Sequence, residues 1–137
     1  LISSIILALD QISKYFIFRT NTNWKFSILA IDNVKNTGAA FGILKNSTFI
    51  LIILSVIIIA GLAYYLKNIP NTRNYNISIS LILAGAMGNL IDRIFLGHVR
   101  DFITISVWPT FNVADAAITI GAILFIAEEI RKDIKKK

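Results

Sequence analysis

The 137-residue chain contains no cysteine and a single histidine, His98. Without cysteine it can form neither disulfides nor thiolate metal sites, and thiol catalysis is excluded. One histidine leaves little for a zinc site, because such sites take several nitrogen or sulfur ligands. We therefore expect no metal and no cofactor.

Charged residues are also scarce, at 16% of the chain, whereas 55% of the residues are hydrophobic and the mean hydropathy is +0.69. A soluble chain this short cannot bury so much apolar surface. The net charge is +6, but the basic residues lie in loops and at the ends of apolar segments. This pattern fits anionic lipid headgroups better than a nucleic acid. We predict a membrane protein whose partners include lipid but no nucleic acid.

Four nearly uncharged segments each approach the roughly 20 residues that a helix needs to cross the hydrocarbon core. The predicted spans cover about residues 1–18, 47–66, 75–94 and 111–130. We therefore predict one integral membrane domain over residues 1–137, with an all-α fold built on a bundle of four transmembrane helices.

The first predicted span contains Asp10 and Lys14, which are four residues apart and therefore share one face of a helix. Two interpretations remain open for this pair. It is either an ion pair that locks the bundle or a direct participant in chemistry.

Residues 19–46 form the only long segment outside the predicted spans. The stretch 24–31 alternates bulky apolar with smaller or polar residues, which favours short strands or an interfacial ribbon. The following Asn36-Thr-Gly38 indicates a turn, and the small residues Gly38, Ala39 and Ala40 permit close approach of another backbone. Substrate contact and simple packing are both open for this turn.

The third span ends in a polar face. Asn89 and Arg93 are four residues apart, and Asp92 lies three residues after Asn89. An amide and a guanidinium at a helix mouth can hold the carbonyl groups of a peptide. Alternatively, Asp92 and Arg93 only anchor the helix at the membrane interface.

Residues 99–107 alternate in the manner of a strand, and Trp108-Pro109 indicates the membrane interface and the start of a helix. Asn112 is a suitable N-cap, which places Asp115 at the third helical position. Asp115 is thus either a catalytic group or a carboxylate that closes a helix N-terminus. Since capping does not explain Asp101, we take the two as a candidate catalytic pair at one face of a membrane.

Orientation follows from the basic residues of the short connection 67–74 and of the C-terminal tail, which we place in the cytoplasm. Both chain ends are then inside, and Asp101 and Asp115 face outward.

Five motifs in this order resemble those of the lipoprotein signal peptidases (signal peptidase II), aspartyl peptidases of the bacterial inner or cytoplasmic membrane. The motifs are Asp10-Gln-x-x-Lys14, Asn36-Thr-Gly-Ala-Ala-Phe41, Gly88-Asn-Leu-Ile-Asp-Arg93, Val99-Arg-Asp-Phe102 and Phe111-Asn-Val-Ala-Asp115. The resemblance implies a small extracytoplasmic β-cradle between helices one and two, which agrees with the ribbon expected within residues 19–46.

The resemblance also implies residue roles. Asp101 and Asp115 are the catalytic dyad. The residues that line the site and bind substrate are Asn36, Gly38, Asn89, Arg93 and Asn112. Structural support comes from Asp10, Lys14 and Asp92. Many members carry an apolar residue where this chain has Arg100, so we expect Arg100 to add positive charge near the dyad and to alter its titration.

The implied substrate is a bacterial prolipoprotein whose cysteine bears diacylglycerol, cut just before that cysteine by a monomeric enzyme. Two carboxylates that share a water share one proton, and the ionised member activates the water. We assign the lower pKa to Asp115, because of its helix N-terminus, and the retained proton to Asp101. The competing hypotheses are a small proton-coupled transporter that relays protons between its aspartates and a non-catalytic membrane scaffold.

Overall fold

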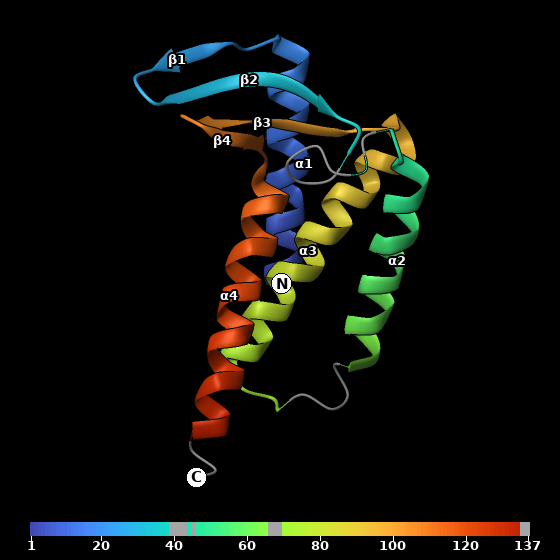
Figure 1. Cartoon of the computed structure of the whole chain (residues 1–137), viewed down its shortest axis with the longest axis vertical. Helices are drawn as coiled ribbons and strands as arrows, with labels where there is room; N and C mark the ends of the chain where they lie inside the picture. The colour runs from blue at the N-terminus through green and yellow to red at the C-terminus, as the bar shows by residue number, and fades with distance from the viewer. Residues whose placement is uncertain (39–43, 45, 66–69, 135–137) are drawn as a thin grey trace.

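The computed structural model describes residues 1–38, 44, 46–65 and 70–134, and within these ranges the chain forms four helices and one four-stranded sheet (Figure 1). The helices are α1 (Ile2–Thr20), α2 (Thr48–Tyr65), α3 (Arg73–Leu96) and α4 (Val113–Ile134). The strands are β1 (Trp24–Phe26), β2 (Leu29–Asn36), β3 (Val99–Ile105) and β4 (Trp108–Phe111). Ala39, Ala40 and part of the predicted connection 67–74 lie outside the described residues.

Helix α3 is the centre of the bundle, because it packs against each of the other three helices (Figure 1). Its most extensive contact is with α4 and depends on glycine. A Cβ on Gly85 would lie 2.3 Å from the carbonyl oxygen of Ala114, and a Cβ on Gly121 would lie 2.7 Å from that of Ser78. Small residues let membrane helices approach this closely. Helices α3 and α4 therefore form one tightly packed unit.

Two helices of the described chain, α2 and α3, are long and apolar enough to cross a membrane. Helix α2 fully buries only Leu51, and most of its other apolar side chains are exposed and free to contact lipid. Helix α4 also exposes a series of large apolar side chains, namely Ile120, Ile123, Leu124, Ile126 and Ile130. The prediction of apolar membrane helices is thus confirmed for α2 and α3, and the crossing of α1 and α4 stays a prediction.

The sheet has the order β1-β2-β3-β4, is antiparallel throughout, and lies across one end of the bundle (Figure 1). We expected a cradle from residues 19–46, between helices one and two. That segment supplies only β1 and β2, whereas β3 and β4 come from the connection between α3 and α4. The two halves join where β2 pairs with β3, with Val34 opposite Asp101 and Asn36 opposite Val99.

The helix start predicted at Trp108-Pro109 is wrong. Both residues belong to β4, an edge strand, where a proline is tolerated because its missing N–H leaves no ladder bond unmade. Phe111 pairs with Ile103 of β3, so the helix begins only at Val113, after the N-cap position Asn112. The fourth helix therefore starts two residues later than the predicted span at 111.

The close packing of α3 on α4 predicts that Gly85→Ala is destabilising. The added methyl group would meet the backbone of α4, which cannot move aside without separating the two helices. Overpacking of this kind costs about 1–3 kcal/mol, so the melting temperature in detergent micelles should fall by several degrees. Gly61→Ala is the matched control, because nothing lies within 4 Å of a Cβ at Gly61. An equal response of the two variants would contradict the proposed role of Gly85.

Candidate active site

Asp101 lies on β3, directly beneath the β2 strand that pairs with it, and its side chain is 1% exposed. Asn36 Nδ2 donates to its Oδ2 at 2.8 Å, and Asn112 Nδ2 donates to its Oδ1 at 2.6 Å. Burial raises the pKa of Asp101 to about 6, and the nearby charge of Asp115 adds to the increase. The two amide hydrogen bonds and the charge of Lys14 act in the opposite direction.

Asp115 occupies the first turn of α4, where it completes the predicted capping box with Asn112. The backbone N–H of Asp115 donates to Asn112 Oδ1 at 2.9 Å, and the backbone N–H of Asn112 donates to Asp115 Oδ2 at 3.2 Å. The capping prediction is therefore confirmed. The remaining carboxylate oxygen of Asp115 accepts a hydrogen bond from Asn89 Nδ2 at 2.8 Å.

Two amides connect the two acids. Asn112 Nδ2, which bonds Asp101, also donates to Asn89 Oδ1 at 3.1 Å, while the amide nitrogen of Asn89 bonds Asp115. A continuous path of hydrogen bonds therefore runs from Asp101 through Asn112 and Asn89 to Asp115. Because an amide both donates and accepts, it can separate two carboxylates without adding a third charge.

A buried ionic cluster lies next to this path and contacts it through Asn89. Lys14 Nζ lies 2.8 Å from Asp10 Oδ2 and 3.4 Å from Asp92 Oδ2, and it donates to Asn89 Oδ1 at 3.2 Å. The predicted Asp10–Lys14 pair is thus confirmed as a contact. The other oxygen of Asp10 accepts the backbone N–H of Ala114 at 2.9 Å, which ties α1 to the first turn of α4.

Arg100 does not take the place that we expected for it. Since neighbouring residues of a strand point to opposite faces, Arg100 turns away from Asp101. Its Nη2 lies 2.7 Å from Asp92 Oδ1 and donates to Gln11 Oε1 at 3.1 Å, and its backbone N–H donates to Asp92 Oδ2 at 2.9 Å. Arg100 therefore extends the ionic cluster, and the positive charge that lowers the pKa of Asp101 is that of Lys14.

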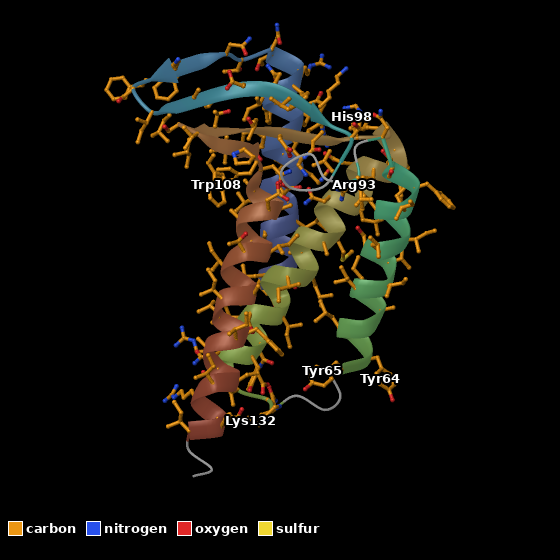
Figure 2. All side chains as sticks on the ribbon, viewed as in Figure 1. Tyr64, Tyr65, Arg93, His98, Trp108 and Lys132 are labelled. Carbon is orange, nitrogen blue, oxygen red and sulfur yellow. The ribbon has the colours of Figure 1, made fainter. Side chains whose placement is uncertain are left out.

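The turn after β2 meets the end of α3. Asn36 Oδ1 accepts the backbone N–H of Gly38 at 2.9 Å, and Arg93 Nη2 donates to the carbonyl oxygen of Gly38 at 3.1 Å. Figure 2 shows Arg93 at the sheet end of α3. The side chain of Asn36, at the end of β2, and that of Arg93, on α3, therefore hold the turn in place.

Both aspartates line one cavity of about 1150 Å³ between the sheet and the first turns of α4. Its polar lining outside the dyad includes Lys35, Asn36, Thr37, Arg93, Thr110 and Thr119, and its apolar lining includes Val34, Ile105, Trp108, Phe111, Ile118 and Ile120. The structure thus brings the predicted substrate-contact residues Asn36, Gly38 and Arg93 to the same cavity wall as the dyad, with Asn89 and Asn112 bonded to the acids behind it.

Some residues of the site were not predicted. Gln11 belongs to the first motif but was given no role; it donates to the carbonyl oxygen of Gly88 at 3.1 Å and accepts a hydrogen bond from Arg100 in the ionic cluster. Its polar side chain inside an apolar segment is the signal that could have indicated a role. The threonines Thr110 and Thr119 carry no such signal. Among the described residues, no three His, Asp or Glu side chains gather in a way that could hold a metal ion.

Two solved structures of bacterial membrane enzymes share this fold. One, determined by the in meso method at 2.3 Å resolution, is 35% identical, with a TM-score of 0.92 over 99% of this chain and 89% of the other. The second, determined by the same method at 1.9 Å resolution, is 36% identical, with a TM-score of 0.83 over 93% of this chain and 88% of the other. The fold is thus one that bacterial membrane enzymes share.

The chain matches the family model described as Signal peptidase (SPase) II over residues 2–131 and belongs to the signal peptidase II family. The prediction of the family is thereby confirmed. Its members are proteases that remove signal peptides from prolipoproteins, so the prediction of a membrane protease for lipoprotein processing holds at this level.

The ionic cluster predicts a large effect of Asp92→Asn. The substitution leaves Lys14 and Arg100 buried with one carboxylate fewer, and breaking a buried ion pair costs about 3–5 kcal/mol. Glu128→Gln is the control, because the Glu128–Arg131 pair is 3.8 Å apart, the Arg131 side chain is 59% exposed, and a glutamine oxygen can still accept the hydrogen bond from Asn74. Its loss should cost below about 1 kcal/mol. Unfolding in detergent, followed by circular dichroism, measures both, and a silent Asp92→Asn would contradict the cluster's role.

The environment of Asp101 predicts how its carboxyl group titrates. Below a pH of about 6 the group is mainly protonated, and above it mainly ionised. In Asp115→Asn the repulsion from the neighbouring charge is gone, so the pKa of Asp101 should fall. It should stay above its ordinary value, because burial is the larger cause. Infrared difference spectra across pH, with Asp101→Asn to assign the band, measure this shift, and a rise in pKa would contradict the Coulombic contribution.

Proposed function

We propose that this protein is an aspartic endopeptidase in which Asp101 and Asp115 are the catalytic dyad. The observation that carries the proposal is that both carboxylates line one cavity and are joined through two amides. Asp101 comes from β3 and Asp115 from α4, and both lie at this cavity. Asparagine amides donate hydrogen bonds to both carboxylates. This arrangement suits acid–base activation of a water beside a peptide bond.

The chemistry divides between the two acids according to their surroundings. Ionised Asp115, at a helix N-terminus, takes a proton from a water whose oxygen attacks the scissile carbonyl carbon. Asp101 holds the shared proton and donates a hydrogen bond to the developing oxyanion. The C–N bond then breaks, and the leaving amine takes a proton from the dyad. Water is consumed, and a new carboxyl group and a new amine are formed.

An apolar substrate strengthens this division. Filling the cavity excludes water from Asp101, and desolvation further favours its protonated form.

The substrate in this proposal is a prolipoprotein whose cysteine carries diacylglycerol, cut just before that cysteine. The cavity, at about 1150 Å³, exceeds the roughly 300–1,000 Å³ of ordinary ligand pockets, and its apolar walls suit acyl chains. Arg93, Lys35 and the threonines supply donors for backbone carbonyls and ester oxygens.

The proposed enzyme is a monomeric, multi-pass protein of the bacterial inner membrane with its active site on the extracytoplasmic side. Figure 2 shows Tyr64, Tyr65 and Lys132 at the end of the bundle away from the sheet, and Arg93 and Trp108 at the sheet end. Tyrosine and tryptophan favour both interfaces of a membrane, and the basic residues Arg131 and Lys132 at the end of α4 fit the cytoplasmic one. The sheet and the dyad then lie outside.

A proton-coupled transporter is less compatible with the same residues. Asp10 and Asp92, the other aspartates of the supposed relay, are fully buried and paired with Lys14 and Arg100. Both carboxylates are therefore partners in buried ion pairs that hold the helices together, whereas a relay needs carboxylates that exchange a proton in each cycle.

The test of the proposal is cleavage by purified protein in bilayers of a diacylglyceryl-modified precursor, with the unlipidated precursor beside it. Asp101→Asn and Asp115→Asn should each reduce kcat at least about 100-fold, since positioned acid–base groups contribute that much or more. In each variant the asparagine oxygen keeps one of the two hydrogen bonds that the carboxylate accepts, and circular dichroism checks that the variants remain folded. The control is Asp133→Asn, an exposed position at the far end of α4.

Two results would contradict the proposal. Unchanged cleavage in either dyad variant would remove the aspartic mechanism, and equal cleavage of lipidated and unlipidated precursor would remove the diacylglyceryl requirement.

A further inference from the structure

The free end of the sheet is formed by two hairpin turns, residues 26–29 and 105–108, which we call the sheet tip. The turns are joined, because Leu29 pairs with Ile105 and the backbone N–H of Ser106 donates to the carbonyl oxygen of Ile28 at 2.7 Å. Figure 1 shows this end of the sheet projecting sideways beyond α4. The sheet tip is therefore one structural unit that extends past the side of the bundle.

The sheet tip is apolar and exposed. It contains no charged residue, and its large side chains are open to the surroundings: Val107 is 97% exposed, Phe26 69%, Ile28 62%, Trp108 59% and Leu29 44%. A contiguous apolar surface of this kind is disfavoured in water and marks contact with a membrane or another molecule.

The position of α4 sets the level of the sheet tip relative to a bilayer. Trp108 precedes the first residue of α4 by only five positions. The end of α4 carries Glu128, Glu129, Arg131, Lys132 and Asp133, so its apolar part is residues 113–127, about 22 Å long at 1.5 Å per residue. Because this is shorter than the roughly 30 Å of the hydrocarbon core, the first turn of α4 reaches no farther than the edge of the hydrocarbon when α4 spans the membrane, and the sheet lies no farther out than the headgroups.

We infer that the sheet tip is a membrane anchor that inserts into the interfacial layer of the leaflet on the dyad side. Tryptophan and other large apolar side chains favour this layer, and Lys25, next to the sheet tip on β1, can meet lipid phosphates. The anchor continues the lipid-facing surface of α4 sideways. Because Ile105 and Trp108 also line the cavity, it holds the roof of the cavity against the leaflet from which a lipid-bearing substrate comes.

The chain offers a direct probe, since Trp24 and Trp108 are its two tryptophans and both lie in the sheet. In Trp24→Phe, emission reports on Trp108 alone. In proteoliposomes, lipids brominated near the headgroup end of the acyl chains should reduce this emission about two-fold, and lipids brominated near the methyl end should act less. Quenching by iodide in the water, with no effect of bromolipid, would overturn the anchor.

A charge at the sheet tip supplies the second test. In the Trp24→Phe background, Val107→Asp should abolish most of the bromolipid quenching, because a carboxylate is expelled from the interfacial layer. Asn23→Asp is the matched control, with the same added charge at an exposed position near α1, and should leave the quenching unchanged. Circular dichroism checks that both variants fold. Equal quenching in Val107→Asp and its parent would overturn the inference.

A second copy of the chain is the other candidate occupant of the sheet tip. In that case the emission of Trp108 would change with the protein-to-lipid ratio and ignore bromination, which also overturns the anchor. None of these readouts depends on catalysis, so the anchor and the proposed peptidase activity succeed or fail separately.

Discussion

The carboxylate of Asp10 fixes where the first turn of α4 lies. One of its oxygens accepts the backbone N–H of Ala114, and the other is paired with Lys14, with both side chains fully buried. An unpaired charge at this depth would cost several kcal/mol, so the contact strongly disfavours any arrangement in which α4 slides along α1. Asn112 and Asp115 belong to the same turn, and their position follows from this contact.

The amide side chains of Asn89 and Asn112 have a complementary role. Each binds one aspartate and the two bind each other, so the acids keep their relative placement without a cation between them. A lysine or arginine in the same place would hold both carboxylates ionised. Neutral bridges leave the dyad free to carry a shared proton, which the proposed mechanism requires.

Features that depend on neighbouring residues could be predicted from the sequence, and features that depend on distant ones could not. Two contacts followed from spacing within one helix, and both are present in the structure. They are the ion pair of Asp10 with Lys14, four residues apart, and the capping box of Asn112 with Asp115, three residues apart. The hydrogen bond from the backbone N–H of Ala114 to Asp10 joins residues 104 apart in sequence, and no local sequence pattern predicts it.

The sheet illustrates the same limit. Alternation indicated strands at 24–31 and 99–107, but pairing between them depends on how α1 and α3 pack, so half of the sheet was missing from the predicted cradle. Pro109 indicated a helix start because an edge strand and a first helical turn both tolerate proline. The roles of Asp101 and Asp115 came from the resemblance, and they stay predictions until the variants are assayed.

The origin of the two acids on different parts of the fold bears on biogenesis. Asp101 is held by the sheet and Asp115 by the last helix, and the sheet itself needs strands from both halves of the chain. A nascent polypeptide emerging into the bilayer therefore has no complete dyad until its final segment is threaded and docked. Under the proposed mechanism, a chain whose last helix has not yet docked cannot cleave the precursors around it.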